Sequence, residues 1–282
     1  MLIAQLTDIH LGFDPDDPDE LNTQRFDQAL AHLTRRRMAP DLVIVSGDLT
    51  ERGDEASYAR VVERLGRLPC PVHYAFGNHD IRDAFRAVAP AQPSVDGYLQ
   101  YAVDLPGLRM LVLDTLEEGR HGGAFDTVRA KWLAAELARH PNTPAVIVMH
   151  HPPFDTGIDW LTTDPDEPWV GTFRQAIAGA PQLRAIWSGH VHRAIASAEG
   201  GVPMLVAPSI APAVHLALAP LDPHAPDDRP MVTTEPPGYA LHLWQRGRMV
   251  SHFVDAVDYP ALAKFDTRMQ GLVQHLRDER TH

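Results

Sequence analysis

The sequence predicts an α/β protein in which helices cover two β-sheets. In the first half of the chain, short apolar runs rich in β-branched residues alternate with longer segments whose apolar residues recur every three or four positions. Strands and helices that alternate in this way build a sheet with helices on its outer faces. The last third is richer in strands, and apolar runs paired around turn residues predict antiparallel hairpins there.

The first half contains three strand–helix units. The strands are predicted at residues 2–7, 42–46 and 72–76, and the helices at residues 21–37, 54–67 and 80–88. The first helix carries Phe26 and Leu33 on one stripe, a spacing that predicts a buried face. Asp80 either caps the third helix or orients the neighbouring His79.

The middle of the chain continues with strands and helices. Residues 99–114 predict two antiparallel strands joined at Pro106-Gly107. A helix follows at residues 126–140, with Val128 and Leu133 expected on its inner face. After it we expect, in order, a strand at residues 145–149, a long loop at 152–171, a helix at 172–179, and strands at 184–188 and 202–207.

The C-terminal part combines a loop, a hairpin and a final helix. Residues 217–237 hold six prolines without any periodicity, so we expect a surface loop. Residues 238–256 predict a hairpin with Gly247 in its turn. Residues 261–280 predict an amphipathic helix, which either packs on its own domain or contacts a second copy of the chain.

Composition and charge disfavour several classes of partner. The net charge is −12 and basic residues form no long run, which disfavours a nucleic-acid polymer. No apolar stretch approaches the ~20 residues that a membrane span needs, and the N-terminus lacks a signal-peptide pattern, so we expect a cytoplasmic protein without a membrane partner. The single cysteine, Cys70, has no activating pattern around it. Of the 282 residues, we expect 1–258 to form one domain and 259–282 to form a helical segment for packing or for assembly into a homo-oligomer.

Asp, Asn and His residues follow five of the apolar runs at the point where each run ends. They are Asp8 and His10, Asp48, Asn78 and His79, His150, and His190 and His192. In extended backbone, residues i and i+2 point the same way, so each Asp-x-His or His-x-His pair can aim two side chains into one cleft. Carboxylate, amide and imidazole ligands suit divalent Fe, Mn, Zn or Co, and Asp48 can bridge two such ions. The clusters therefore predict a catalytic two-metal site.

The order of these clusters resembles the calcineurin-like metallophosphoesterase superfamily, whose motifs are D-x-H, G-D, G-N-H-[DE], H-x-P and G-H-x-H. The matching segments are Asp8-Ile9-His10, Gly47-Asp48, Gly77-Asn78-His79-Asp80, His150-His151-Pro152 and Gly189-His190-Val191-His192. Residues 5–10, 148–153 and 213–215 look similar to the branch of bacterial glycerophosphodiesterases and class III cyclic-nucleotide phosphodiesterases. The resemblance implies a four-layer αββα sandwich with a dinuclear centre of two divalent metal ions.

The resemblance also implies roles for individual residues. One metal would be held by Asp8, His10, Asp48 and His192, and the other by Asp48, Asn78, His150 and His190. His150 is chosen over His151 because only His150 has proline two positions later. The implied catalytic residues are His79 and Asp48, and the implied substrate contacts are Asn78, His79 and His215.

These assignments predict a metal-dependent hydrolase of small phosphodiesters, such as glycerophosphodiesters or cyclic nucleotides. Two adjacent cations can share a water, lower its pKa and hold a phosphoryl oxygen for in-line attack. Residues 152–173 hold five acidic residues and no Lys or Arg, which favours a singly charged diester over a monoester dianion or a polynucleotide. The alternatives are a phosphomonoesterase or nuclease on the same scaffold and a non-catalytic interaction module. The loop's aromatic residues, Phe154, Trp160 and Trp169, either line a substrate mouth or pack the loop.

Overall fold

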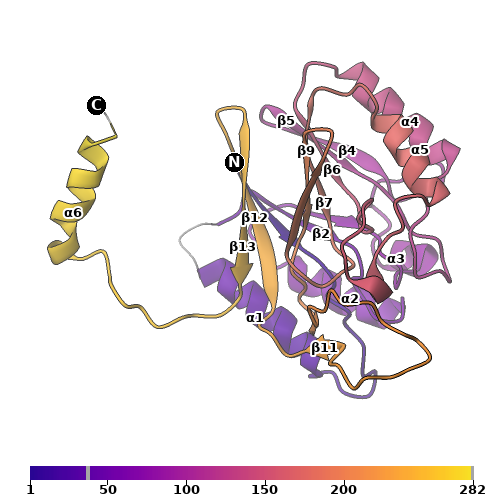
Figure 1. Ribbon diagram of the computed structural model, residues 1–282, viewed down its shortest axis with the longest axis horizontal. Helices are drawn as coiled ribbons and strands as arrows, with labels where there is room; N and C mark the ends of the chain where they lie inside the picture. Colours follow the sequence, from indigo (N-terminus) through magenta and orange to yellow (C-terminus); the bar gives the residue numbers. More distant parts are fainter. Residues whose placement is uncertain (36–38, 281–282) are drawn as a thin grey trace.

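Two large β-sheets pack face to face between layers of helices in the computed structural model of the protein, which describes residues 1–35 and 39–280 (Figure 1). Among these residues, the first sheet has five strands and the second has six. Helices from the N-terminal half pack with the first sheet, and two helices from the middle of the chain pack on the second. The layers confirm the predicted αββα sandwich.

The first sheet combines three N-terminal strands with the C-terminal hairpin. Its strands are β1 (Leu2–Leu6), β2 (Leu42–Ser46), β3 (Val72–Ala75), β12 (Gly238–Gln245) and β13 (Arg248–Asp255). β1, β2 and β3 run parallel, and β12 pairs antiparallel with β1, which gives the order β13-β12-β1-β2-β3. β2 is buried along its whole length because both of its faces are covered.

Three helices pack with this sheet in one apolar cluster. They are α1 (Leu21–Arg35), α2 (Glu55–Leu65) and α3 (Arg82–Val88). α1 buries Phe26 and Leu33, as their spacing predicts. The side chain of Asp54 accepts a hydrogen bond from the Ser57 amide and caps α2. Residues 36 and 37, the predicted end of the first helix, lie outside the described residues.

The second sheet is built from the middle of the chain. Its strands are β4 (Tyr101–Leu105), β5 (Leu108–Val112), β6 (Ala145–Val148), β7 (Leu183–Ser188), β8 (Ile195–Glu199) and β9 (Val202–Val206), in the order β4-β5-β6-β7-β9-β8. α4 (Thr127–Arg139) and α5 (Pro168–Ile177) pack on its outer face (Figure 1). α4 buries Leu133, but Val128 is exposed, so its predicted inward position is wrong. The buried stripe starts one residue later, at Arg129, which lies one helical turn before Leu133.

Several elements of this half differ from the prediction. α5 begins at Pro168, four residues before the predicted start, because proline fits the first helical turn, where its missing N–H breaks no helical bond. The prediction omits β8, whose residues are mostly small and exposed. The short strands β10 (Ala213–Val214) and β11 (Val232–Thr233) pair across most of the proline-rich segment, and a 3-10 turn, η1 (Asp159–Leu161), interrupts the predicted long loop.

A buried polar network ties the two sheets together just below the strand ends. The Gln5 amide donates to Ser46 Oγ at 2.8 Å and to the Ser188 carbonyl oxygen at 2.9 Å. Nε2 of His242 lies 3.0 Å from Gln5 Oε1, and the His242 ring stacks on Trp187 with centroids 3.8 Å apart. These contacts join β12, β1 and β2 of the first sheet to β7 of the second. They therefore fix the two sheets relative to each other close to the loops that carry the predicted ligands.

The C-terminal helix, α6 (Thr267–Asp278), stands apart from the two sheets at the end of an extended segment (Figure 1). It is shorter than predicted, and none of its residues, all of which are described, is buried. Leu262, Phe265, Leu272 and Leu276 expose large apolar side chains. Within the described ranges, no helix combines the length and the apolar character that crossing a membrane requires.

Candidate metal centre

The predicted ligands gather at one end of the sheets, in the loops that follow β1, β2, β3, β6 and β7. These strands run parallel within each sheet, so their carboxyl ends meet at one edge. A cavity of about 700 Å³ opens there, which suits a small molecule. Its wall includes His10, Asp48, His79, His190 and His192.

The backbone of the ligand loops adopts uncommon conformations. Asp8, His10, Asp48, His190 and His192 have φ between 49° and 72°, and they are five of the eight non-glycine residues with positive φ in the described chain. Side chains rarely tolerate this region, and such residues cluster at functional sites. The prediction that Asp8 and His10, and likewise His190 and His192, converge because their backbone is extended is therefore wrong. Their side chains converge because the chain turns sharply past each strand, not because it stays extended.

Two glycines let these loops come into contact. Gly47 has a φ of 107°, and a Cβ on it would lie 2.3 Å from His150 Nδ1. A Cβ on Gly77 would lie 2.2 Å from Asp48 Oδ1. Any larger residue would push apart the loops that bring the carboxylate and the imidazole together.

His10 and His192 face each other across one part of the cleft. Nδ1 of His10 lies 2.7 Å from Glu51 Oε2, and Nδ1 of His192 lies 2.9 Å from the Pro212 carbonyl oxygen. Each Nδ1 carries the proton that it donates, so in the neutral form of each ring Nε2 keeps its lone pair. Both Nε2 atoms are therefore available as metal ligands.

The first predicted ligand set fits a divalent cation. The Nε2 atoms of His10 and His192 are 3.1 Å apart. Nε2 of His10 lies 3.4 Å from Asp48 Oδ2, and Nε2 of His192 lies 3.5 Å from Asp8 Oδ1. Two lone pairs and two carboxylate oxygens so close together repel one another unless positive charge lies among them.

The second predicted set centres on His150. Its Nδ1 donates to the Ser46 carbonyl oxygen at 2.9 Å, which leaves Nε2 free. That Nε2 lies 3.2 Å from Asp48 Oδ2 and 3.3 Å from Asn78 Oδ1. The ring of His190 lies beside it, with centroids 5.1 Å apart. Asp48 faces both sets, as a bridging ligand would.

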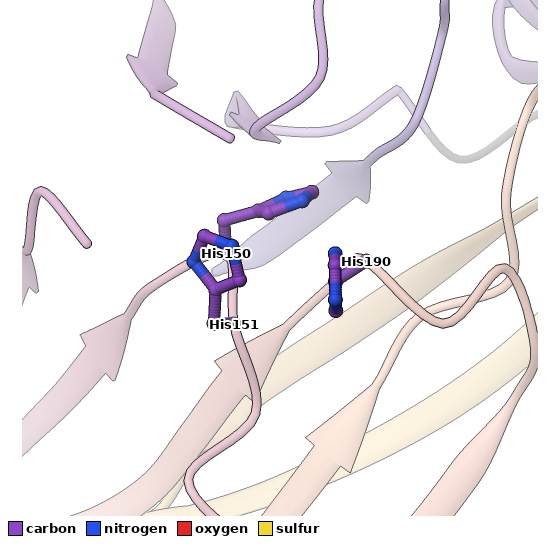
Figure 2. A group of neighbouring side chains, drawn as sticks. All are labelled: His150, His151 and His190. Atoms are coloured by element: carbon purple, nitrogen blue, oxygen red, sulfur yellow. The ribbon is translucent and has the colours of Figure 1, made fainter. Parts of the chain in front are cut away.

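Three imidazoles crowd this side of the centre, because His150 and His151 follow the end of β6 and His190 follows β7 (Figure 2). Their nearest nitrogens lie within 4.8 Å of one another, so proximity alone does not separate His150 from His151. Both nitrogens of His151 have other partners, Thr115 Oγ1 at 2.8 Å and the His121 carbonyl oxygen at 3.2 Å. These partners favour His150 as the ligand, which stays a prediction.

The charges of the centre attract a cation. Burial alone would raise the pKa of Asp48, but nearby imidazoles, chiefly His150, hold that pKa well below its usual value. Burial would lower the pKa of His150, yet Asp48 and Asp8 raise it to about 9, so a metal ion that binds this ring must displace a proton held by the same carboxylates. Burial lowers the pKa of His190 and of His192, which keeps both rings neutral, as metal ligands must be.

Glu51 belongs to the centre and was missed by the sequence prediction. Its carboxylate holds Nδ1 of His10, and its carbonyl oxygen accepts a hydrogen bond from Nδ1 of His79 at 2.9 Å. It therefore orients one predicted ligand and the predicted catalytic histidine. The sequence feature that could have indicated this role is the position of Glu51 three residues after Asp48, in the turn that follows β2.

Asp80 holds two ligand loops together and does not cap α3, whose N-cap is Ile81 without a side-chain bond. The buried carboxylate accepts hydrogen bonds from the Gly77 amide at 2.8 Å and from the Leu49 amide at 3.2 Å. Tyr58 donates its hydroxyl to the same group at 3.0 Å. The capping alternative is therefore wrong, and Asp80 positions the loops on either side of the centre.

The predicted substrate contacts divide into two groups. His79 lines the cavity, and its backbone amide donates to Asp48 Oδ1 at 2.9 Å. Asn78 lies beside it, with Oδ1 directed at His150. His215, just after β10, is not among the described residues that line the cavity, so the structure does not bring it together with the others. Its contact with substrate stays a prediction.

Part of the cavity wall is acidic. Asp14, Asp17 and Glu20, from the loop before α1, line it, and no Lys or Arg lines it within the described chain. The acidic residues of the 152–173 loop do not line the cavity, so the predicted source of the negative charge is wrong.

The 152–173 loop contributes apolar groups instead. Trp160 and Leu161, in η1, line the cavity. Phe154 and Trp169, the second residue of α5, are buried in the apolar cluster of the second sheet. Of the three aromatic residues, Trp160 therefore lines the mouth, and the other two pack the loop.

Comparison with known proteins agrees with this geometry. A family model, the calcineurin-like phosphoesterase family, matches residues 1–194. A probable cyclic nucleotide phosphodiesterase from Rhodopseudomonas palustris is 31% identical over 268 residues, which are 89% of this chain and 91% of that protein. A probable glycerophosphodiester phosphodiesterase from Arcobacter nitrofigilis is 26% identical and covers 86% of this chain and 89% of its own. A dimetal phosphatase from Danio rerio shares the fold, with a TM-score of 0.63, 17% identity, and coverage of 92% of this chain and 97% of that one.

Proposed function

The chain belongs to the calcineurin-like phosphoesterase family, and from that premise we propose that it is a metal-dependent phosphodiesterase. Its substrates would be small diesters, such as glycerophosphodiesters or cyclic nucleotides, the classes named for the two bacterial relatives. One observation carries the proposal. Imidazole Nε2 atoms and carboxylate oxygens converge, 3.1–3.4 Å apart, on the floor of a cavity of small-molecule size.

Two divalent cations, when bound, would supply a nucleophile at neutral pH and would neutralise charge on the phosphoryl group. Four residues would hold the first ion, namely Asp8, His10, Asp48 and His192. Four would hold the second, namely Asp48, Asn78, His150 and His190. Nitrogen and oxygen ligands without thiolate fit Fe, Mn, Zn or Co.

His79 is the group of this chain best placed to act on the substrate. Its Nδ1 donates to the Glu51 carbonyl oxygen, so Nε2 is the nitrogen left to face the cavity that the ring lines. In the imidazolium form, in which both ring nitrogens carry a proton, Nε2 would donate a hydrogen bond to a phosphoryl oxygen and then transfer its proton to the departing alkoxide, which leaves the neutral ring protonated on Nδ1. Glu51 would keep the ring in this orientation during both steps.

The charge of the cavity favours diesters. A monoester carries two negative charges near neutral pH, and such groups usually meet Arg or Lys side chains in their sites. Here the cavity wall includes Asp14, Asp17 and Glu20, so a singly charged diester is repelled least. Trp160 offers an apolar face to the alcohol or base of the substrate.

The test compares two chromogenic substrates on protein loaded with the same metals. We expect kcat/KM for bis(p-nitrophenyl) phosphate to exceed that for p-nitrophenyl phosphate by at least ~10-fold, about 1.4 kcal/mol of barrier. Long DNA or RNA should be degraded poorly. A monoester value equal to or above the diester value would favour the phosphomonoesterase alternative and reject this proposal.

We also propose that the chain forms a homo-oligomer through its C-terminal segment, residues 259–282, which follows a domain over residues 1–258. The support is the apolar surface that Leu262, Phe265, Leu272 and Leu276 expose on and before α6. Residues 281 and 282 lie outside the described chain. The cytoplasmic location stays a prediction.

A further inference from the structure

We propose that His121 is a positioning residue that orients the Asn78 amide, with the amide oxygen toward the second metal. Nδ2 of Asn78 lies 3.1 Å from Nδ1 of His121, and Oδ1 lies 3.3 Å from Nε2 of His150. The inference rests on the metal centre proposed above. It adds a residue that no motif of the ligand set contains.

The side-chain amide of Asn78 has two chemically different ends, and only one can bind a cation. The oxygen carries lone pairs, whereas the NH₂ group only donates. If the amide turned over, its NH₂ group would face the metal position and the ligand would be lost. The orientation therefore needs a partner that accepts a hydrogen bond from the NH₂ end.

His150 does not by itself set this orientation. When a cation is bound at Nε2, the ring is neutral with its proton on Nδ1, which donates to the Ser46 carbonyl oxygen, and Nε2 gives Asn78 Oδ1 no proton. The NH₂ end, by contrast, meets Nδ1 of His121, which accepts its hydrogen bond in the tautomer that carries the proton on Nε2. The acceptor on His121 thus selects the amide orientation that a metal requires.

The loop that carries His121 is held in place by a buried residue. Nε2 of His151 donates to the His121 carbonyl oxygen at 3.2 Å. A Cβ on Gly123 would lie 3.0 Å from His151 Cβ, so the loop passes closely over that ring. The His121 ring also lies beside His190, with centroids 4.9 Å apart. The imidazole itself is exposed toward the cavity, so its removal leaves the core intact.

The test measures metal binding to metal-free protein by calorimetric titration with Mn²⁺ alone. His121→Phe keeps a flat ring and removes the acceptor, and we expect one of the two sites to weaken by at least ~10-fold while the other is unchanged. His121→Asn keeps an acceptor near the position of Nδ1, and we expect both affinities within about 3-fold of wild type. His252→Phe, at an exposed position on β13, is the matched control and should bind as wild type does.

The variants separate a failure of this inference from a failure of the proposed metal centre. If His121→Phe binds both ions as wild type does, or if His121→Asn is as weak as His121→Phe, the inference is wrong. His121→Leu is a second acceptor-free variant should the phenyl ring disturb the loop. If wild-type protein itself binds fewer than two ions, the proposed metal centre fails instead.

Discussion

Asp48 contributes one carboxylate to two ligand sets. Its Oδ2 lies 3.4 Å from Nε2 of His10 and 3.2 Å from Nε2 of His150. Removing it would take a ligand from both metals, whereas removing His79 leaves both sets complete. We therefore expect Asp48→Ala to lose at least ~10-fold more kcat/KM than His79→Ala, about 1.4 kcal/mol of barrier. Comparable activities of the two variants would contradict the bridging role.

His150 and His151 are adjacent in sequence but have different partners. Nε2 of His150 faces Asp48, whereas both nitrogens of His151 are engaged by Thr115 and the His121 backbone. We expect His150→Ala to lower the metal content of purified protein from two ions toward one, as measured by elemental analysis. His151→Ala removes no predicted ligand and should keep two sites, with a lower affinity at the second because the His121 loop loses one contact. The reverse result would show that the His-x-Pro spacing was misread.

The ligand set was predictable from sequence because its members come in ordered blocks with fixed spacing. Glu51 and His121 were not predictable in this way. Each is a single residue in a loop, and its contact depends on a tertiary approach, to His10 in one case and to Asn78 in the other. The convergence of Asp8 and His10 was predicted for the wrong reason, since both lie in left-handed backbone that no periodicity reveals.

At the scale of elements, the strands and helices with strong periodicity were predicted within a few residues. β2 follows from the apolar run Leu42–Val45, and α2 follows from an amphipathic stretch. β8 could not be predicted, because its sequence, IASAE, lacks apolar alternation and it pairs only at an edge, with β9. The start of α5 was misplaced because Pro168 was read as loop rather than as a first-turn residue.

The polar network between the sheets makes stability depend on pH. Burial lowers the pKa of His242 to about 3, against 6.5 for the ordinary side chain. Below pH 6.5 the unfolded chain binds a proton that the folded protein does not, so this group's contribution to stability falls as the pH drops from 6.5 toward 3. Between pH 7.5 and pH 5, we expect it to reduce the free energy of unfolding by about 2 kcal/mol.

Urea unfolding of wild type and His242→Gln at these two pH values measures that contribution. Gln keeps a donor for Gln5 Oε1 but does not titrate, so its loss of stability over the interval should be smaller by about 2 kcal/mol. The comparison uses the change in the free energy of unfolding between the two pH values, so any loss of stability that the substitution causes at both pH values cancels. Equal pH dependence of both proteins would show that His242 does not remain neutral in the folded state.

At the scale of the whole molecule, the C-terminal segment is the feature that a single chain does not explain. α6 stands apart from the sheets and buries none of its residues, and Leu272 and Leu276 lie one turn apart on its surface (Figure 1). β13, the strand that precedes this segment in the chain, is an edge strand of the first sheet. Apolar surface of this extent on a terminal helix is stabilised when a second copy covers it.

We therefore expect light scattering to give the mass of a dimer or a larger assembly at micromolar concentration. Leu272→Glu combined with Leu276→Glu places charge on the proposed contact and should shift the protein toward the monomer. The matched control places the same residue at exposed positions of another helix, Thr34→Glu with Arg35→Glu at the end of α1, and should leave the mass unchanged. Because α6 buries no residue in the core, the fold of the monomer should survive, and we expect the double variant still to unfold in one cooperative thermal transition. A monomeric mass for wild type across the concentration range would leave the helix without the partner inferred here.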